Sequence, residues 1–334
     1  MVLKAGLVGL GMMGRNHARL LQSTDGVELM AVVDPVGDVD GSIRSARVVE
    51  SVDQMLEIGV DICVVACPTE DHEPVGLALA AGGVHALIEK PLATDLDSAQ
   101  RIVDAYEAAS LVGAVGHIER SNAAVRVMRD RISDGDLGEL YQVATRRVGP
   151  FPGRIRDVGV VKDLATHDLD LAAWVGGSKF ASISAHTAHR AGRQHEDLLS
   201  ATGLLENGVI TNHLVNWLTP YKERLVVATG EGGCLVADTL VADLTRFENA
   251  SVTLEWGGIS DFRGVSEGNV TRYAIAKPEP LRVQLENFRD VVNGLDAEIV
   301  PLRDGLLAVE AADAAVLSAI EGRTVRMSPD EEER

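Results

Sequence analysis

The chain has 334 residues and a net charge of −19 at pH 7, and such an acidic surface argues against nucleic acids and anionic membranes as partners. Its length favours two domains, and a hydrophobic content of 46% is enough to build a core in each. No apolar run reaches the roughly 18 residues of a membrane span, and the first predicted strand begins too early for a signal peptide, so we expect a cytoplasmic protein.

The first predicted element is an apolar strand at residues 3–8, which runs through a glycine-rich turn into a helix over residues 12–22. In the turn, Gly9 permits a sharp bend, Gly11 lets a pyrophosphate approach the backbone, and Gly14 lets helix and strand pack closely. The first N–H groups of the helix point at the phosphates. This pattern predicts a dinucleotide site that includes Gly9, Gly11, Met12, Met13 and Gly14.

A second strand, residues 28–33, ends in Asp34, twenty residues after Gly14. At that place a carboxylate accepts hydrogen bonds from the adenosine ribose, and it would repel a 2′-phosphate. We therefore predict that Asp34 binds the cofactor and that the cofactor is NAD rather than NADP. The alternative is a structural glycine turn in another kind of α/β protein.

Strands and helices alternate up to about residue 120, which predicts a parallel, doubly wound sheet. The expected strands cover residues 47–50, 61–67, 84–88 and 111–116, and the expected helices cover residues 52–58, 70–81 and about 95–109, the last capped by Thr94 or Asp95. We assign residues 1–120 to a dinucleotide-binding Rossmann domain. Cys63 and Cys67 fall in or beside the strand at 61–67 and are interpreted as small core residues in a reducing compartment.

Several candidate site residues follow directly after predicted strands: Asp34, Pro68 and Thr69, Lys90, and His117. Because ligands bind beyond the carboxyl ends of parallel strands, these residues should converge on one crevice. Pro68 and Thr69 are expected to line the cofactor site, and His117 is expected to line the crevice rather than to act as a catalyst.

The pattern changes after residue 121, where strands become frequent and alternate polar with apolar positions. We expect an α+β domain over residues 121–330 that binds the substrate and mediates oligomerisation, with a mostly antiparallel open sheet and helices on one face. The expected strands cover residues 140–148, 181–189, 198–205, 209–218, 225–228 and 235–240, and the expected helices cover residues 123–132, 281–292, 304–320 and a segment containing Asp163, His167 and Asp170.

Taken together, the motifs resemble the glucose–fructose oxidoreductase/inositol dehydrogenase (Gfo/Idh/MocA) family, in that family's order and over most of the chain. They are Gly9-x-Gly11-x-x-Gly14-x-x-His17, Glu89-Lys90-Pro91, Gly116-His117 with Arg120, and Asp163-x-x-x-His167-x-x-Asp170 with Trp174. The resemblance implies a two-domain fold, a nicotinamide cofactor, and oxidation or reduction of a sugar or polyol hydroxyl. One departure is Ala165, where the family often has glycine.

Asp163 and His167 lie four residues apart, so a helix would present both on one face, and an imidazole with a nearby carboxylate is suited to act as a base for a hydroxyl proton. The resemblance implies a catalytic Lys90 in a cis Lys90–Pro91 pair, and it places His72 and Glu89 in loops beside the cofactor. The predicted substrate site therefore contains Lys90, His117, Asp163 and His167. A plain Asp/His pair on a helix surface is the alternative, and no third ligand with metal spacing appears, so we predict no metal.

A basic island contrasts with the acidic remainder of the chain and precedes the Asp163 segment: Arg146, Arg147, Arg154, Arg156 and Lys162. It predicts an anionic substrate, with Arg146, Arg154 and Arg156 as donors to a diphosphate. The stretch also resembles the family branch of UDP-N-acetylglucosamine 3-dehydrogenases, so the leading hypothesis is oxidation of C3 in a UDP-N-acetylhexosamine. A basic loop paired with acidic neighbours, or a subunit interface, would explain the same residues.

The same sequence features are compatible with other functions. The same fold could serve myo-inositol or another free sugar or polyol, it could use NAD transiently in oxidation–elimination chemistry, or it could be a non-catalytic dinucleotide sensor. We expect a small-molecule partner and a homodimer or homotetramer formed through the C-terminal sheet.

Overall fold

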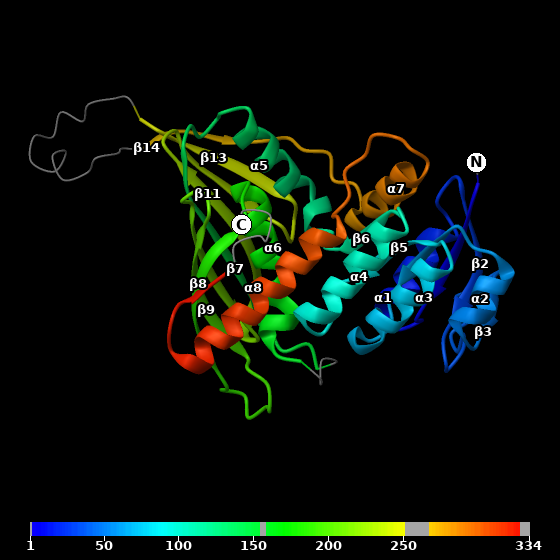
Figure 1. The fold of residues 1–334 in the computed structure, drawn as a ribbon. Helices are drawn as coiled ribbons and strands as arrows, with labels where there is room; N and C mark the ends of the chain where they lie inside the picture. Colours follow the sequence, from blue (N-terminus) through cyan, green and yellow to red (C-terminus); the bar gives the residue numbers. More distant parts are fainter. Residues whose placement is uncertain (1, 154–157, 251–266, 328–334) are drawn as a thin grey trace, which may run out of the picture. The chain divides into compact units, whose positions relative to one another are not determined.

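The computed structural model describes residues 2–153, 158–250 and 267–327, and the chain divides into two compact units. The first unit combines Met1–Ser121 with Pro278–Asp313, and the second combines Asn122–Lys277 with Ala314–Arg334 (Figure 1). Among the described helices, none has both the length and the apolar character needed to cross a membrane.

The first unit contains a parallel six-stranded sheet in the order β3-β2-β1-β4-β5-β6. The order reverses between β1 and β4, so ligands are expected at the carboxyl ends of these two strands. This confirms the predicted doubly wound sheet. The strands are β1 (Leu3–Val8), β2 (Val27–Val33), β3 (Arg47–Val49), β4 (Ile62–Val65), β5 (His85–Glu89) and β6 (Gly113–Gly116).

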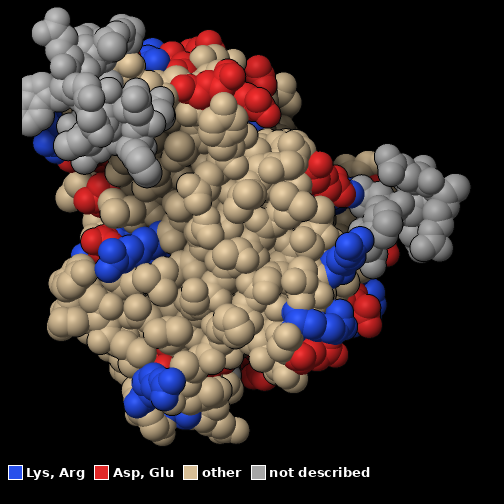
Figure 2. Space-filling view, turned by 90° about the vertical axis from the view of Figure 1, so that its left-hand side faces the viewer, with Lys and Arg blue, Asp and Glu red and all other residues tan. Residues whose placement is uncertain are grey.

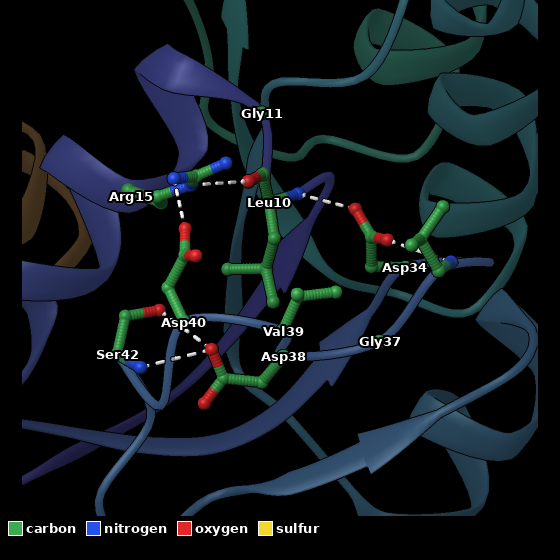
Figure 3. A pocket seen from close by; sticks show the side chains of 10 residues that line it. Leu10, Gly11, Arg15, Asp34, Gly37, Asp38, Val39, Asp40 and Ser42 are labelled. Carbon is green, nitrogen blue, oxygen red and sulfur yellow. Dashed lines mark hydrogen bonds and ion pairs between the residues drawn. The ribbon is translucent and has the colours of Figure 1, made fainter.

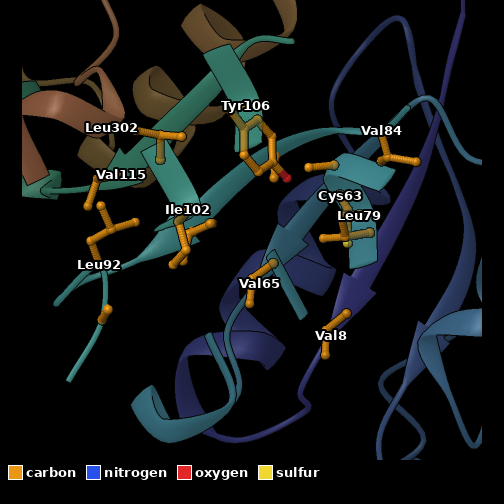
Figure 4. Close-up of a cluster of buried hydrophobic side chains, with 14 of the residues drawn as sticks. Val8, Cys63, Val65, Leu79, Val84, Leu92, Ile102, Tyr106, Val115 and Leu302 are labelled. Carbon is orange, nitrogen blue, oxygen red and sulfur yellow. The ribbon is translucent and has the colours of Figure 1, made fainter. Parts of the chain in front are cut away.

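Two hydrophobic clusters cover the two faces of this sheet, because alternate residues of each strand point to opposite sides. On one face Cys63 and Val65 pack with Leu79, Ile102 and Tyr106 from the helices (Figure 4). That face is covered by α2 (Val52–Ile58), α3 (His72–Ala81), α4 (Leu96–Ala108) and the start of α8 (Leu302–Glu321). Of the two caps predicted for α4, Thr94 or Asp95, the structure has Asp95, whose carboxylate accepts from the Ser98 N–H at 2.8 Å.

The opposite face is covered by α1 (Met12–Leu21) and by α7 (Pro280–Val292), which comes from the far end of the sequence. Leu285 and Phe288 of α7 are fully buried against Leu87 and Ala114 of the sheet. Helix α1 covers only part of this apolar face, and α7 covers the rest. A single boundary near residue 120 therefore misplaces residues 278–313, although the functional assignment of the two domains stays a prediction.

The second unit contains a nine-stranded sheet in the order β14-β13-β12-β11-β7-β10-β9-β8-β15. Among the described strands of this unit, only β7 and β10 pair in parallel, so the predicted, mostly antiparallel sheet is confirmed. The strands are β7 (Leu140–Pro150), β8 (Phe180–Ala188), β9 (Leu198–Leu205), β10 (Ile210–Asn216), β11 (Leu218–Gly230), β12 (Gly233–Asp238), β13 (Asp243–Asn249), β14 (Glu267–Arg272) and β15 (Val325–Arg326).

Strand prediction was less accurate here than in the first unit. β7 continues through Gly149 and Pro150, beyond the expected end of the strand at residue 148, because Pro150 still pairs with Leu218 of β11. The strands β13, β14 and β15 were not predicted. β13 has the polar sequence Asp-Leu-Thr-Arg-Phe-Glu-Asn, and its place in the ladder comes from pairing with β12 rather than from an apolar pattern.

One face of the nine-stranded sheet is covered by helices. Helix α5 (Ala123–Ser133) packs on β12 and β13, and α6 (Thr166–Gly176) packs on β7 and β10. Figure 2 shows the other face, which carries few charged side chains over a broad area. On it, Leu204, Ile210 and Leu214 are each exposed by more than a third.

Candidate active site

The glycine-rich turn has the local geometry that a bound pyrophosphate requires. Gly9 has φ = +94°, and a Cβ on it would lie 2.6 Å from the Ala66 carbonyl oxygen at the end of β4. A Cβ on Gly14 would lie 1.9 Å from the Gly9 oxygen, so helix α1 can pack this closely against the turn only if residue 14 is glycine. Gly11 precedes α1, and the space around its missing Cβ is open. The residues present therefore fit a dinucleotide phosphate at the start of α1.

Asp34 follows β2 and fixes the end of the turn. Its two carboxylate oxygens accept from the Leu10 N–H at 2.7 Å and from the Val36 N–H at 2.9 Å. It lines a pocket of about 220 Å³ together with Gly11, Arg15 and Asp40 (Figure 3). A carboxylate oxygen has two lone pairs, so Asp34 retains acceptor capacity for ribose hydroxyls. The cofactor role of Asp34 stays a prediction, and the pocket has the position that this role requires.

Lys90 follows β5, and the backbone around it is held by a buried network. Glu89, which is 8% exposed, accepts from His17 Nε2 at 2.7 Å and from the Lys90 N–H at 3.3 Å. Burial disfavours its charged form, but the hydrogen bond from His17 and the charge of Lys90 lower the pKa of Glu89 below its usual value. His17 of the glycine motif thus links α1 to the strand that carries Lys90.

Gly116 explains another part of the motif set. It pairs with Glu89 across β5 and β6, and a Cβ on it would lie 2.9 Å from a Glu89 carboxylate oxygen. Any larger residue would therefore disturb the Glu89–His17 contact. The carboxylate of Glu89 is used inside the protein, so its predicted contact with the cofactor rests on the resemblance alone. The Lys90–Pro91 peptide bond is cis, as expected.

His72 joins the loops that follow β4 and β5. Its Nδ1 lies 2.9 Å from the Pro91 oxygen and its Nε2 lies 3.2 Å from the Cys67 oxygen. Burial lowers the pKa of His72, and this effect outweighs the two carbonyl contacts, which favour the protonated ring. His72 therefore holds together the loops that contain Pro68 and Lys90. His117 is also buried, 1% exposed, just after β6.

In the second unit, Asp163 and His167 do not lie on one continuous α-helix. Asp163 belongs to η3 (Val161–Ala165), a π-helical turn, and His167 is the second residue of α6. Single π-helical turns are uncommon and occur often at functional sites. The turn is held by Glu196, whose carboxylate accepts from the Val161 N–H at 3.1 Å. His167 is 8% exposed and Ala165 is fully buried.

The basic island does not form one cluster. Arg147 is 3% exposed, and its Nε lies 3.0 and 3.1 Å from the two carboxylate oxygens of Asp168 on α6. Arg146 is the next residue along β7 and therefore points to the opposite face of the sheet, where it pairs with Glu223 at 2.8 Å. The structure does not bring Arg146 to the helix that carries His167. Arg154 and Arg156 lie outside the described residues.

Two further arginines, one in each unit, were not predicted as site residues from the sequence. Arg193, in the segment that contains Glu196, stacks 3.9 Å from the Phe151 ring centroid and 4.7 Å from that of Trp217. Arg15 lines the pocket beside Asp34, and its position directly after Gly14 was the only signal in the sequence. In the part of the chain that the structure describes, no three His, Cys, Asp or Glu side chains group as a metal site would.

Comparison with known proteins identifies both units. The protein-family model described as "Oxidoreductase family, NAD-binding Rossmann fold" matches residues 3–117, and the family model of the GFO/IDH/MocA C-terminal domain matches residues 125–236. The chain is 30% identical over 294 residues to UDP-N-acetylglucosamine 3-dehydrogenase of Acidithiobacillus ferrooxidans, covering 87% of this chain and 88% of that protein.

A second relative acts on a different substrate. Inositol 2-dehydrogenase 4 of Saccharopolyspora erythraea is 28% identical over 341 residues, covering 96% of this chain and 94% of that protein. Among solved structures, that of UDP-N-acetylglucosamine 3-dehydrogenase GnnA from Acidithiobacillus ferrooxidans superposes with a TM-score of 0.83 at 24% identity, over 95% of this chain and 97% of that one. At that identity the superposition supports the fold alone.

Proposed function

Because this chain belongs to the Gfo/Idh/MocA family of NAD-binding oxidoreductases, we propose that it oxidises a sugar hydroxyl, namely the C3 hydroxyl of a UDP-N-acetylhexosamine. The observation that carries the proposal is the 30% identity, over 87% of the chain, to an enzyme with that activity. The family assignment, the NAD cofactor and the dehydrogenase class agree with the sequence predictions. The choice of substrate is the part that this proposal adds.

Each proposed catalytic group has a defined local setting. Bound NAD⁺ would supply the hydride acceptor. Lys90 is proposed to donate a hydrogen bond to the reacting hydroxyl oxygen, which stabilises alkoxide character, and the backbone that carries it is fixed through Glu89 and His17. His167 is proposed to take the hydroxyl proton, with Asp163 on the preceding π-helical turn in a supporting role.

A second substrate class is favoured by specific observations. Arg147 is committed to Asp168, and Arg146 points to the other face of the sheet, so neither supports a diphosphate-binding role. A free polyol needs no such donors, and an inositol dehydrogenase is among the relatives that match most of the chain. Myo-inositol or another free sugar or polyol is therefore the second candidate.

A substrate panel separates these candidates. UDP-N-acetylglucosamine, free N-acetylglucosamine and myo-inositol are compared at equal concentration with NAD⁺, and NADH formation is followed. We expect kcat/KM for the UDP-sugar to be at least about tenfold higher, because a single charge-assisted hydrogen bond to the diphosphate, for which Arg154 and Arg156 stay the predicted donors, contributes about that much. Faster turnover of an unphosphorylated compound contradicts the nucleotide-sugar proposal. Product formation without net NADH indicates transient use of NAD, and NAD binding without turnover across the panel favours a sensor.

We also propose that the open face of the nine-stranded sheet joins copies of this chain into a homodimer or homotetramer. On this face, the side chains that lie next to one another across β11, β7, β10 and β9 are mostly uncharged. One such row consists of Val227, Ala144, Asn212 and Thr202 and carries no charge. Leu204, Ile210 and Leu214 are exposed on this face. In a chain of net charge −19, a broad face with few charged side chains (Figure 2) is the exception and is typical of a protein interface. A cytoplasmic location stays a prediction.

Light scattering after gel filtration tests the interface. The unmodified chain is expected to elute as a dimer or tetramer, and Ile210→Glu with Leu214→Glu is expected to yield monomers, because buried carboxylates at the interface would be desolvated. Leu295→Glu, at a 60% exposed residue of the first unit, is the matched control and should leave the assembly intact. A monomeric unmodified chain would refute the proposed interface.

A further inference from the structure

The pocket beside Asp34 contains a guanidinium that the sequence motifs leave without a role. Arg15 follows the last glycine of the turn and lines this pocket together with Asp34, Asp38 and Asp40. The described lining therefore holds three carboxylates and one cation. Because Asp34 is expected to meet the ribose, the other charged groups of the pocket bear on whether a 2′-phosphate is accepted.

Arg15 and Asp34 are positioned by the same residue. The Arg15 Nε donates to the Leu10 carbonyl oxygen at 3.0 Å, and the Leu10 N–H donates to Asp34 at 2.7 Å. The carbonyl oxygen and the N–H of Leu10 thus hold the guanidinium of Arg15 and the carboxylate of Asp34, respectively (Figure 3). Arginine is the side chain best suited to hold a phosphate, because its planar fork offers two parallel donors.

Asp40 engages this guanidinium. The Nη1 of Arg15 forms an ion pair with the Asp40 carboxylate, and both side chains are about half exposed, at 53% and 51%. An exposed ion pair of this kind contributes little to folding stability. Its effect should instead be local, because it neutralises the one cation that faces the pocket.

We propose that Asp40, by pairing with Arg15, prevents this arginine from binding a 2′-phosphate, so that Asp40 acts with Asp34 to set the preference for NAD over NADP. A phosphate monoester carries a charge of about −1.5 to −2 at pH 7, and the pocket opposes it with two more carboxylates than guanidinium groups. The proposal concerns the cofactor only and is independent of the sugar substrate.

The test is a set of dissociation constants for NAD⁺ and NADP⁺, measured by calorimetry at low ionic strength, where exposed charges are least screened. The unmodified protein should bind NAD⁺ more tightly. Asp34→Asn should reduce the ratio of the two dissociation constants. Adding Asp40→Asn to it should then tighten NADP⁺ binding by about tenfold, because Arg15 becomes available for a charge-assisted contact with the phosphate.

Two matched variants separate release of Arg15 from a simple loss of negative charge. Asp34→Asn with Asp38→Asn removes the same charge from the same pocket, but Asp38 accepts from Ser42 and Ile43 rather than from Arg15. It should gain less than about threefold in NADP⁺ affinity. Adding Arg15→Gln to the Asp34→Asn, Asp40→Asn protein should abolish the tenfold gain while NAD⁺ binding persists.

The proposal is overturned if Asp40→Asn gives no gain in the Asp34→Asn protein, if Asp38→Asn gives an equal gain, or if Arg15→Gln leaves the gain intact. Asp34 also accepts from two backbone N–H groups, so a variant of Asp34 that no longer binds NAD⁺ would leave the comparison without a reference. In that event Asp40→Asn alone decides the matter. It should raise NADP⁺ affinity by about threefold, and only while Arg15 is present; an unchanged affinity, or a gain that persists with Arg15→Gln, also overturns the proposal.

Discussion

Replacing His167 or Lys90 by alanine is expected to lower kcat by roughly 10²–10⁴-fold while the dissociation constant for NAD⁺ changes little, because proton transfer by a positioned side chain contributes about that much. Asp163→Asn should cost less than the His167 change, since in the proposed function its carboxylate supports the imidazole. Steady-state kinetics on the substrate identified by the panel and calorimetric titration with NAD⁺ give the two quantities.

Surface variants of the same residue types serve as controls. His186 is exposed on β8 and Lys4 is exposed on β1, so alanine at either position should leave kcat within about twofold. Near-normal kcat in His167→Ala would show that the π-helical turn and α6 do not supply the base. Near-normal kcat in Lys90→Ala would show that Lys90 takes no part in the proposed chemistry.

Arg147→Met is expected to lower the free energy of unfolding by about 3–5 kcal/mol, because it leaves the carboxylate of Asp168 buried without its guanidinium. The side chains of Arg147 and Asp168 are 4% and 2% exposed, and the arginine approaches both carboxylate oxygens. The measurement is a urea titration followed by tryptophan fluorescence, which reports on the second unit because the tryptophans are Trp174, Trp217 and Trp256.

The neighbouring residue provides the control. Arg146→Met removes the same side chain from the same strand, but the Arg146–Glu223 pair lies at the open face, so the cost should stay below about 1 kcal/mol. Changing Arg147 to Met together with Asp168 to Leu should recover much of the loss, since no isolated charge remains buried. Equal denaturation midpoints for Arg147→Met and Arg146→Met would show that the buried pair does not stabilise the unit.

The sequence alone was enough to predict the features that depend on neighbouring residues. The strand–glycine–helix order of residues 3–22, the position of Asp34 after β2 and the cap at Asp95 all follow from short stretches, and each is present in the structure. The ordered motifs carried the family, the NAD cofactor and the dehydrogenase class. These predictions succeeded because backbone conformation and local spacing are largely determined within a few residues.

Only the tertiary structure decided which of these side chains are available. Arg146 and Arg147 look alike in the sequence, but α6 covers one face of β7 and so buries Arg147 while it leaves Arg146 on the other face. In the same way Glu89 meets His17 across 72 residues, Arg15 meets Asp40 across 25, and α7 returns to cover the first sheet. Contacts between distant segments depend on how whole elements pack, and no local pattern in the chain records them.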